Sequence, residues 1–110
     1  MPNNRKRPIT PEDFYLLRLV FDPQLSPDAS RVAYTVGWAD RESDQHRMSV
    51  YVAPVDGRAP PRRFTHGEHD HSPRWSPDGR YLAFVSNRGE KNQLFVAPLD
   101  GGEARRLRDA

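Results

Sequence analysis

The stretch Pro73-Arg74-Trp75-Ser76-Pro77-Asp78-Gly79-Arg80-Tyr81-Leu82-Ala83-Phe84 decides the fold, because an altered copy of it occurs earlier in the chain. Ser26-Pro27-Asp28-Ala29 lies 50 positions before Ser76-Pro77-Asp78-Gly79. A second matched pair, VYVAPVDG at 50–57 and LFVAPLDG at 94–101, is separated by 44 positions, so the first copy holds six extra residues between its halves. Self-similarity at this period predicts similar units stacked side by side.

Short apolar runs between turn residues predict four strands in each copy. The runs Tyr81-Leu82-Ala83-Phe84-Val85 and Leu94-Phe95-Val96-Ala97 are apolar at every position, so both faces of these strands must be covered. Four-stranded sheets stacked face to face around an axis, the blades of a β-propeller, meet this requirement. We therefore predict an all-β fold with two four-stranded antiparallel propeller blades, a partial β-propeller, preceded by one short N-terminal α-helix. The expected strands are 24–26, 31–36, 48–53 and 62–65, then 73–76, 80–86, 93–97 and 103–107.

The start of the chain has the signals of a helix. Thr10 is a suitable N-cap and Pro11 a suitable first helical residue, while Asp22-Pro23 ends the helix because the residue before proline avoids helical angles. The predicted organisation is a flexible tail at 1–9, a helix at 10–21, the first blade at 22–66 and the second blade at 67–110.

The repeated turn explains which residues recur. Proline fixes φ at the second turn position, and a glycine such as Gly79 accepts a left-handed conformation at the fourth. Ala29 replaces that glycine in the first copy, where a left-handed angle costs about 1 kcal/mol, so the first turn is expected to be strained or differently shaped. The structural repeat motif comprises Ser26, Pro27, Asp28, Trp75, Ser76, Pro77, Asp78 and Gly79, with Trp75 as a packing anchor between blades.

The composition excludes several kinds of site and partner. The 110 residues carry a formal net charge of +2 and include no cysteine, which excludes disulfides and thiolate metal sites. The positive residues are spread over several segments, so no nucleic-acid partner is expected. No apolar stretch serves as a signal peptide or membrane span, so we expect no membrane partner and a cytoplasmic location.

One dense group of possible metal ligands comprises His66, Glu68, His69, Asp70 and His71. Imidazole and carboxylate groups together bind zinc, which makes His66, His69 and His71 candidate metal ligands. The preferred interpretation is a polar connection between blades near the central opening. A substrate-facing role in a complete enzyme is a further alternative. No metal and no cofactor are therefore predicted.

No catalytic residue is predicted. Ser26, Ser43, Ser76 and Ser86 cannot be joined to a base and an oxyanion site from the sequence. The long polar segment 37–47 is expected to be a loop and a contact surface, because loops carry recognition. Trp38 at its start is interpreted as packing under that loop, with a stacking platform for a ligand as the alternative.

The stretch from Pro73 to Phe84 resembles a PD40 or TolB-type propeller repeat. Thr10-Pro11-Glu12-Asp13-Phe14, followed by Asp22-Pro23-Gln24-Leu25-Ser26-Pro27-Asp28, resembles the start of acylaminoacyl-peptidase-like members of the prolyl oligopeptidase family of serine peptidases. The resemblance implies an N-terminal helix, a seven-bladed propeller and a C-terminal α/β-hydrolase domain. It also implies that the propeller admits only short peptides to a Ser-Asp-His site.

The chain departs from that family in having two repeats and no G-x-S-x-G nucleophile elbow. These residues alone are expected to be inactive, although the parent family consists of hydrolases. The leading hypothesis is an N-terminal propeller fragment that acts as scaffold and substrate-size gate. Its partners would be a hydrolase domain or further blades, and peptide substrates in the complete enzyme. The alternative is a self-associating propeller-repeat module for protein–protein interaction, because two blades leave two apolar outer faces uncovered.

Overall fold

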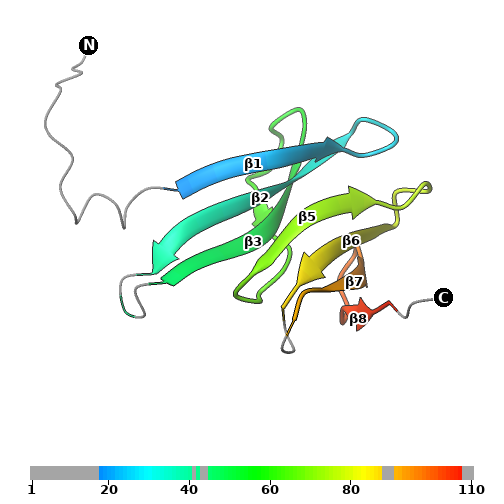
Figure 1. Cartoon of the computed structure of the whole chain (residues 1–110). Helices are drawn as coiled ribbons and strands as arrows, with labels where there is room; N and C mark the ends of the chain where they lie inside the picture. The colour runs from blue at the N-terminus through cyan, green and yellow to red at the C-terminus, as the bar shows by residue number, and fades with distance from the viewer. Residues whose placement is uncertain (1–17, 41, 43–44, 88–90, 108–110) are drawn as a thin grey trace, which may run out of the picture.

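The structure, a computed structural model, describes residues 18–40, 42, 45–87 and 91–107. In these residues all regular structure is β, in two four-stranded antiparallel sheets (Figure 1). The first sheet is ordered β1(Arg18–Leu25), β2(Arg31–Asp40), β3(Gln45–Pro54) and β4(Arg62–Arg63). The second is ordered β5(Asp70–Trp75), β6(Tyr81–Ser86), β7(Gln93–Pro98) and β8(Arg105–Arg106). The prediction of an all-β fold with two four-stranded antiparallel sheets is confirmed.

The predicted N-terminal helix over 10–21 is wrong at its C-terminal end. Arg18 to Phe21 belong to β1, where they pair with β2 from Trp38 to Thr35. Val20 and Phe21 are of the residue types that favour strands, and the ladder to β2 outweighs the local helix signals. Residues 10–17 lie outside the described residues. Within the described ranges, no helix is long and apolar enough to cross a lipid bilayer.

The predicted long loop at 37–47 is also wrong, because most of it is strand. Gly37 to Asp40 continue β2 and pair with Met48 to Gln45 of β3. An ion pair holds the tip together, since Arg47 Nε lies 3.2 Å from Asp40 Oδ2. The polar composition of the segment therefore belongs to a hairpin of paired strands and not to irregular backbone.

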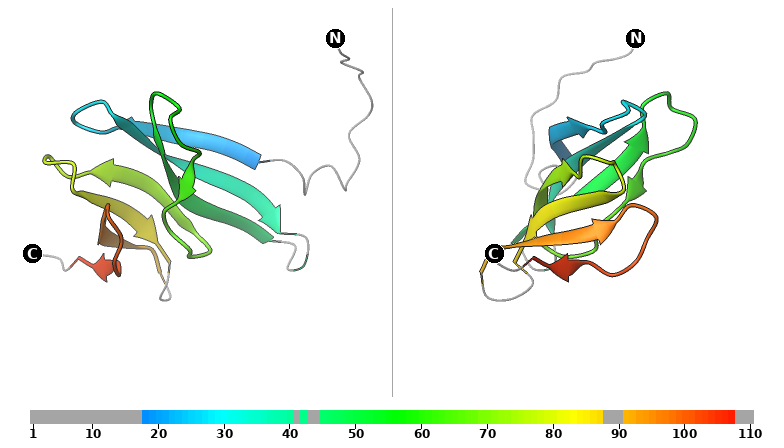
Figure 2. Two further views of the ribbon diagram at one scale, coloured as in Figure 1. Left: turned by 180° about the vertical axis from the view of Figure 1, so that it is seen from behind. Right: turned by 90° about the vertical axis from the view of Figure 1, so that its right-hand side faces the viewer.

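The two sheets pack face to face through what we call their inner faces. Side chains alternate along each strand, so Ala33, Val50 and Val52 of the first sheet point the same way, towards the second sheet. Leu82 and Phe84 of the second sheet meet them, and both are fully buried. The second sheet lies against one face of the first, with β5 beside β2 and β3 (Figures 1 and 2). The opposite sides of the two sheets, the outer faces, have no sheet against them in the described structure.

The repeated turns show why glycine recurs at their fourth position. Gly79 has φ of 73°, and Ala29 takes the same left-handed conformation with φ of 63°. The backbone N–H of each donates to the carbonyl of the turn's first serine, at 2.9 Å and 2.8 Å. Of the two expected alternatives for the first turn, strain is therefore the one observed. The first turn keeps the same shape as the second.

Substituting Ala29→Gly is expected to stabilise the chain by about 0.5–1 kcal/mol, because it removes the contact that a Cβ makes at positive φ. The matched change Gly79→Ala should destabilise it by a similar amount. Urea unfolding of the two variants beside the parent chain measures both effects. If both variants change the free energy of unfolding slightly and in the same direction, the two turns do not share the left-handed conformation.

Candidate functional site

The three candidate histidines do not converge. His66 is exposed, His69 is half-buried beside Met48 in an isolated bridge, and His71 lies in β5. Asp70 is buried, and its Oδ2 accepts a hydrogen bond of 2.7 Å from the backbone N–H of Gly67. In the part of the chain that the structure describes, no three His, Asp or Glu side chains form a group able to hold a metal ion. The segment connects β4 to β5 and so links the two sheets.

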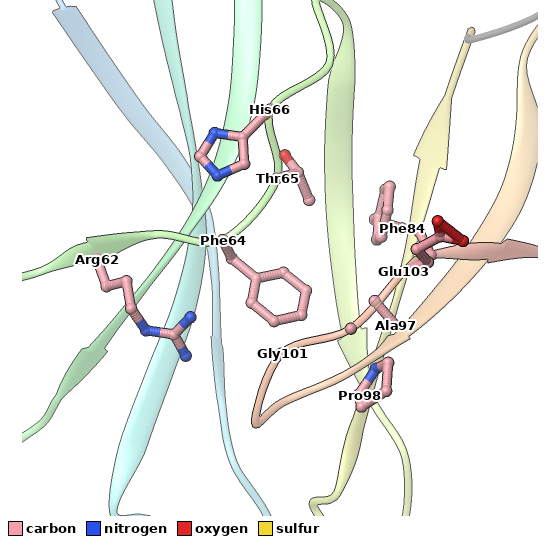
Figure 3. A pocket seen from close by; sticks show the side chains of 11 residues that line it. Arg62, Phe64, Thr65, His66, Phe84, Ala97, Pro98, Gly101 and Glu103 are labelled. Atoms are coloured by element: carbon pink, nitrogen blue, oxygen red, sulfur yellow. The ribbon is translucent and has the colours of Figure 1, made fainter.

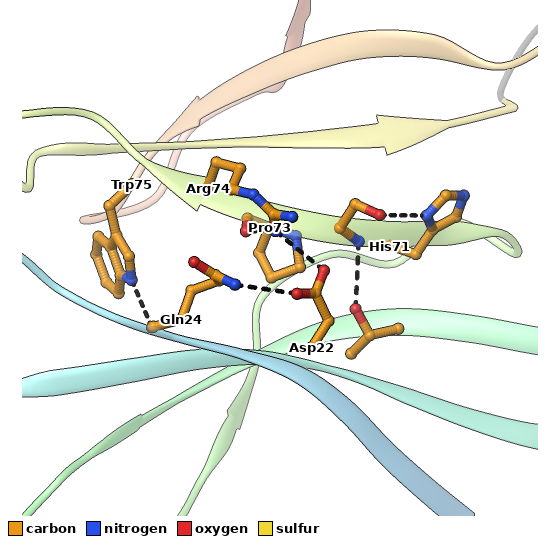
Figure 4. A network of polar contacts seen from close by, with 8 residues as sticks. Asp22, Gln24, His71, Pro73, Arg74 and Trp75 are labelled. Carbon is orange, nitrogen blue, oxygen red and sulfur yellow. Dashed lines mark hydrogen bonds and ion pairs between the residues drawn. The ribbon is translucent and has the colours of Figure 1, made fainter.

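A polar seam joins β1 to β5 across the gap between the sheets (Figure 4). The indole Nε1–H of Trp75 donates to the carbonyl oxygen of Gln24 at 2.8 Å, and Trp75 also packs against the apolar core. Arg74 Nη1 lies 3.0 Å from Asp22 Oδ2. The hydrogen bond from Arg74 is the main reason that the pKa of Asp22 lies below its usual value. These contacts fix the relative position of the two strands.

A serine and a histidine meet at this seam without forming a catalytic pair. His71 Nδ1 lies 2.8 Å from Ser72 Oγ, and Ser72 has the unusual φ of 60°. Asp22, its counterpart 50 residues earlier, has φ of 55°, and both sit where the register shifts against the neighbouring strand. The strained conformation therefore belongs to a bulge that recurs in β1 and β5 and not to a site of chemistry. Asp22-Pro23 and Ser72-Pro73 mark this bulge in the sequence, although no bulge was predicted there.

The serines of the repeat motif form hydrogen bonds within their own turns. Ser26 Oγ donates to Asp28 Oδ1 at 2.8 Å, and Ser76 Oγ donates to Asp78 Oδ1 at 2.7 Å. Ser86 is fully buried, and Ser43 lies outside the described residues. Hydrogen bonds from Ser30, first its hydroxyl and then its backbone N–H, hold the pKa of Asp28 at about 2, below the usual 3.8. The hydroxyl of Ser76 likewise lowers the pKa of Asp78.

The lowered pKa values of Asp28 and Asp78 predict that the stability of the fold decreases in acid. Because their folded-state pKa values are depressed, their contribution to stability is complete above the unfolded pKa of about 3.8 and is lost as pH falls through about 2. We expect the urea midpoint of the parent chain to fall between pH 5 and pH 2. The double variant Asp28→Asn, Asp78→Asn should start lower and lose less over that interval. An equal fall in parent and variant would assign the acid sensitivity to other groups.

A polar and apolar pocket of about 450 Å³ lies between β4 and the loop after β7 (Figure 3). Phe64 lines the pocket, and the guanidinium of Arg62 lies 5.7 Å from the centre of that ring. Arg62 Nη2 also donates to the carbonyl oxygen of Leu99 at 3.1 Å, so this arginine ties the sheets together. His66 and Glu103 line the rim and are exposed. The pocket can accept a side chain, but its residues do not form a nucleophile and base pair.

A second pocket, of about 260 Å³ and mainly apolar, lies on the β2–β3 hairpin. β2 and β3 have 10 residues each, whereas β6 and β7 have 6 each, so the hairpin reaches past the second sheet (Figure 1). Leu19, Phe21, Gly37 and Met48 line the pocket, on the side of the first sheet that elsewhere meets the second sheet. The six extra residues noticed in the sequence build this projection.

Trp38 lies on the outer face of the first sheet, opposite to the inner face. The guanidinium groups of Arg18 and Arg63 each lie 5.4 Å from its ring centre. A cation–π contact contributes about 0.5–1 kcal/mol at an exposed site. The ring therefore stacks on side chains from β1 and β4 and does not pack under its own hairpin.

Known proteins align with nearly all of the chain. It is 41% identical over 108 residues to the uncharacterized peptidase YuxL of Bacillus subtilis, and 37% identical over 78 residues to the Tol-Pal system protein TolB of Thioalkalivibrio sulfidiphilus. These matches cover 94% and 71% of this chain, but the chain spans only 16% and 18% of the two relatives. No protein-family model matches the chain.

Solved structures agree with the sequence matches. Pyrococcus horikoshii acylaminoacyl peptidase is 27% identical and superposes with a TM-score of 0.70, over 88% of this chain and 14% of that one. The β-propeller domain of the trilobed protease from Pyrococcus furiosus is 24% identical with a TM-score of 0.70, over 86% of this chain and 28% of that one, and supports the fold. Together these matches confirm the resemblance to the propeller portion of a peptidase with TolB-type repeats.

Proposed function

Because the chain is homologous to peptidase propellers built of TolB-type repeats, we propose that it is the N-terminal propeller portion of an acylaminoacyl-peptidase-like serine peptidase. In that role it acts as scaffold and substrate-size gate for a hydrolase domain. The observation that carries the proposal is the match of 94% of the chain to a peptidase. The superposition on an acylaminoacyl peptidase supports it.

The geometry suits a gate. Two sheets joined by a buried apolar core and by the polar seam between β1 and β5 form a rigid wall. A rigid wall of stacked blades around an opening excludes large proteins by size and admits short peptides. The described residues contribute no nucleophile of their own, so the chemistry belongs to the hydrolase domain.

The hairpin pocket is the surface that we assign to contact with the hydrolase domain. It lies at the start of β1, where Leu19 and Phe21 are exposed apolar residues. A contiguous apolar patch of this kind on a surface marks an interaction site. Leu19→Asp should weaken the docking of the hydrolase domain without disturbing the sheet core, because Leu19 is already exposed. Ala59→Asp, at an exposed loop position, is the matched control.

The test uses the full-length gene product that contains these residues. We expect it to hydrolyse short N-acylated peptides and to leave unfolded casein intact, whereas residues 1–110 alone hydrolyse neither. Deleting the segment 18–107 should abolish the size discrimination. Full-length protein that cleaves casein as readily as short peptides, or that hydrolyses neither, would contradict the proposal.

A further inference from the structure

The outer face of the first sheet repeats the inner face of the second. On the first sheet, Tyr34 and Tyr51 pair across β2 and β3 with ring centres 6.1 Å apart and planes at 19°. Phe84 and Phe95, their counterparts by the offsets of 50 and 44, pair across β6 and β7 at 6.1 Å and 17°. The same aromatic pair therefore stands on two faces, one in the core between the sheets and one with no sheet against it.

The correspondence extends over the whole face. Val55 is 54% exposed on the first sheet, whereas its counterpart Leu99 on the second is 7% exposed. Leu25 is 57% exposed, whereas its counterpart Trp75 packs against the core. The backbone N–H of Val55 donates to Ser30 just as that of Leu99 donates to Arg80. In order, the matched residues are Leu25, Val32, Tyr34, Tyr51, Ala53 and Val55 with Trp75, Leu82, Phe84, Phe95, Ala97 and Leu99.

The outer face of the second sheet repeats the inner face of the first in the same way. Val50 is fully buried against the second sheet, whereas its counterpart Leu94 is 45% exposed. Phe64 packs on the core, and its counterpart Leu107 is exposed. The matched residues are Ala33, Thr35, Val50, Val52 and Phe64 with Ala83, Val85, Leu94, Val96 and Leu107.

The two uncovered faces are therefore complementary to each other and not each to itself. The outer face of the second sheet has residues matching those with which the first sheet binds the second. The outer face of the first sheet has residues matching those with which the second sheet binds the first. We propose that the outer face of the second sheet binds the outer face of the first sheet of a second copy of this chain, head to tail. The new interface reproduces the inter-sheet core already present within one copy.

One polar contact of the interface follows from the same correspondence. Arg62 donates to the carbonyl oxygen of Leu99 across the present core. Its counterpart Arg105 is exposed on β8, and it would donate to the carbonyl of Val55 in the next copy. Arg18 and Arg63 lie on the receiving face, so basic side chains lie on both surfaces. Association should therefore strengthen as salt screens their repulsion.

Sedimentation velocity tests the proposal with one charged variant on each face. Tyr34→Lys blocks the outer face of the first sheet, and Leu94→Lys blocks that of the second. A charge inside the interface should weaken association by about 30-fold or more. Each variant alone should remain monomeric, and the parent chain should form a concentration-dependent series of oligomers. Ala59→Lys adds the same single positive charge at an exposed loop position, and it should associate like the parent.

Mixing the variants gives the decisive result. Head-to-tail binding predicts a one-to-one heterodimer that grows no further, because each variant keeps the face that the other has lost. Formation of the heterodimer also proves that both variants fold. A parent chain that is folded by circular dichroism but monomeric at every concentration would overturn the proposal. So would a single variant that still dimerises, or a folded mixture that stays monomeric. The association needs no hydrolase domain, so it stands or falls separately from the peptidase function.

Discussion

Truncating Phe84→Ala lowers the free energy of unfolding by about 3–5 kcal/mol. The ring is fully buried between the sheets, and it packs in one cluster with Val50 and Ala97. Its removal leaves a cavity at the centre of the contact between the sheets, where neighbouring strands are held by their ladders and cannot collapse. Such a loss is a large part of the stability of a small domain, so much of the variant should be unfolded in water. Urea denaturation followed by far-ultraviolet circular dichroism measures the effect.

The repeat supplies the control for this variant. Tyr34 is the counterpart of Phe84 and makes the same ring pair, but it lies on an outer face. Tyr34→Ala should cost only about 0.5–1.5 kcal/mol, the value of an aromatic pair without a deep cavity. Equal losses in the two variants, measured on dilute protein, would contradict the assignment of inner and outer faces.

Placing a charge at Val50 should unfold the chain. Val50 is fully buried on the inner face of the first sheet, and its backbone N–H donates to Thr65 Oγ1 at 3.0 Å. Val50→Lys takes an ammonium group out of water between the two sheets, at a cost of about 4 kcal/mol or more. The expected spectrum is that of an unfolded chain, recorded by circular dichroism without denaturant.

Leu94→Lys is the matched control, because Leu94 is the counterpart of Val50 on the second sheet's outer face. Its side chain is already 45% exposed, so the change should alter the free energy of unfolding of the monomer by about 0.5 kcal/mol or less. A fold that tolerates lysine at Val50 as well as at Leu94 would mean that the sheets do not pack through the faces described.

The repeat predicts the two sheets because the same pattern of apolar strand residues occurs twice in the chain. Tyr81 to Val85 are apolar on both sides, and this pattern requires cover above and below. All eight strands and their antiparallel order follow from the matched halves. The outer faces could also be anticipated, since two units share one interface. Which side of each strand is inner follows only when the register places Phe84 in the core and Tyr34 outside it.

Local signals failed where a long-range ladder outweighs them. Residues 18–21 continue an apolar helical pattern, but pairing with β2 makes them strand. At 37–47 the polar composition hid strand pairing, which an ion pair between Arg47 and Asp40 supports across the hairpin. The pocket on that hairpin could not be foreseen, because it is formed by Leu19 and Phe21 of a strand that was predicted to be helix.

Hydrogen exchange of the two tryptophan indole protons, followed by nuclear magnetic resonance, tests the docking of the two sheets most directly. The chain has two tryptophans, one at the seam and one on an outer face. The Trp75 indole proton is bonded across the sheets to Gln24, so it should exchange only when the sheets separate, much more slowly than that of Trp38. Equal and fast exchange of the two indole protons in a chain whose strand amides stay protected would contradict the docking of the sheets.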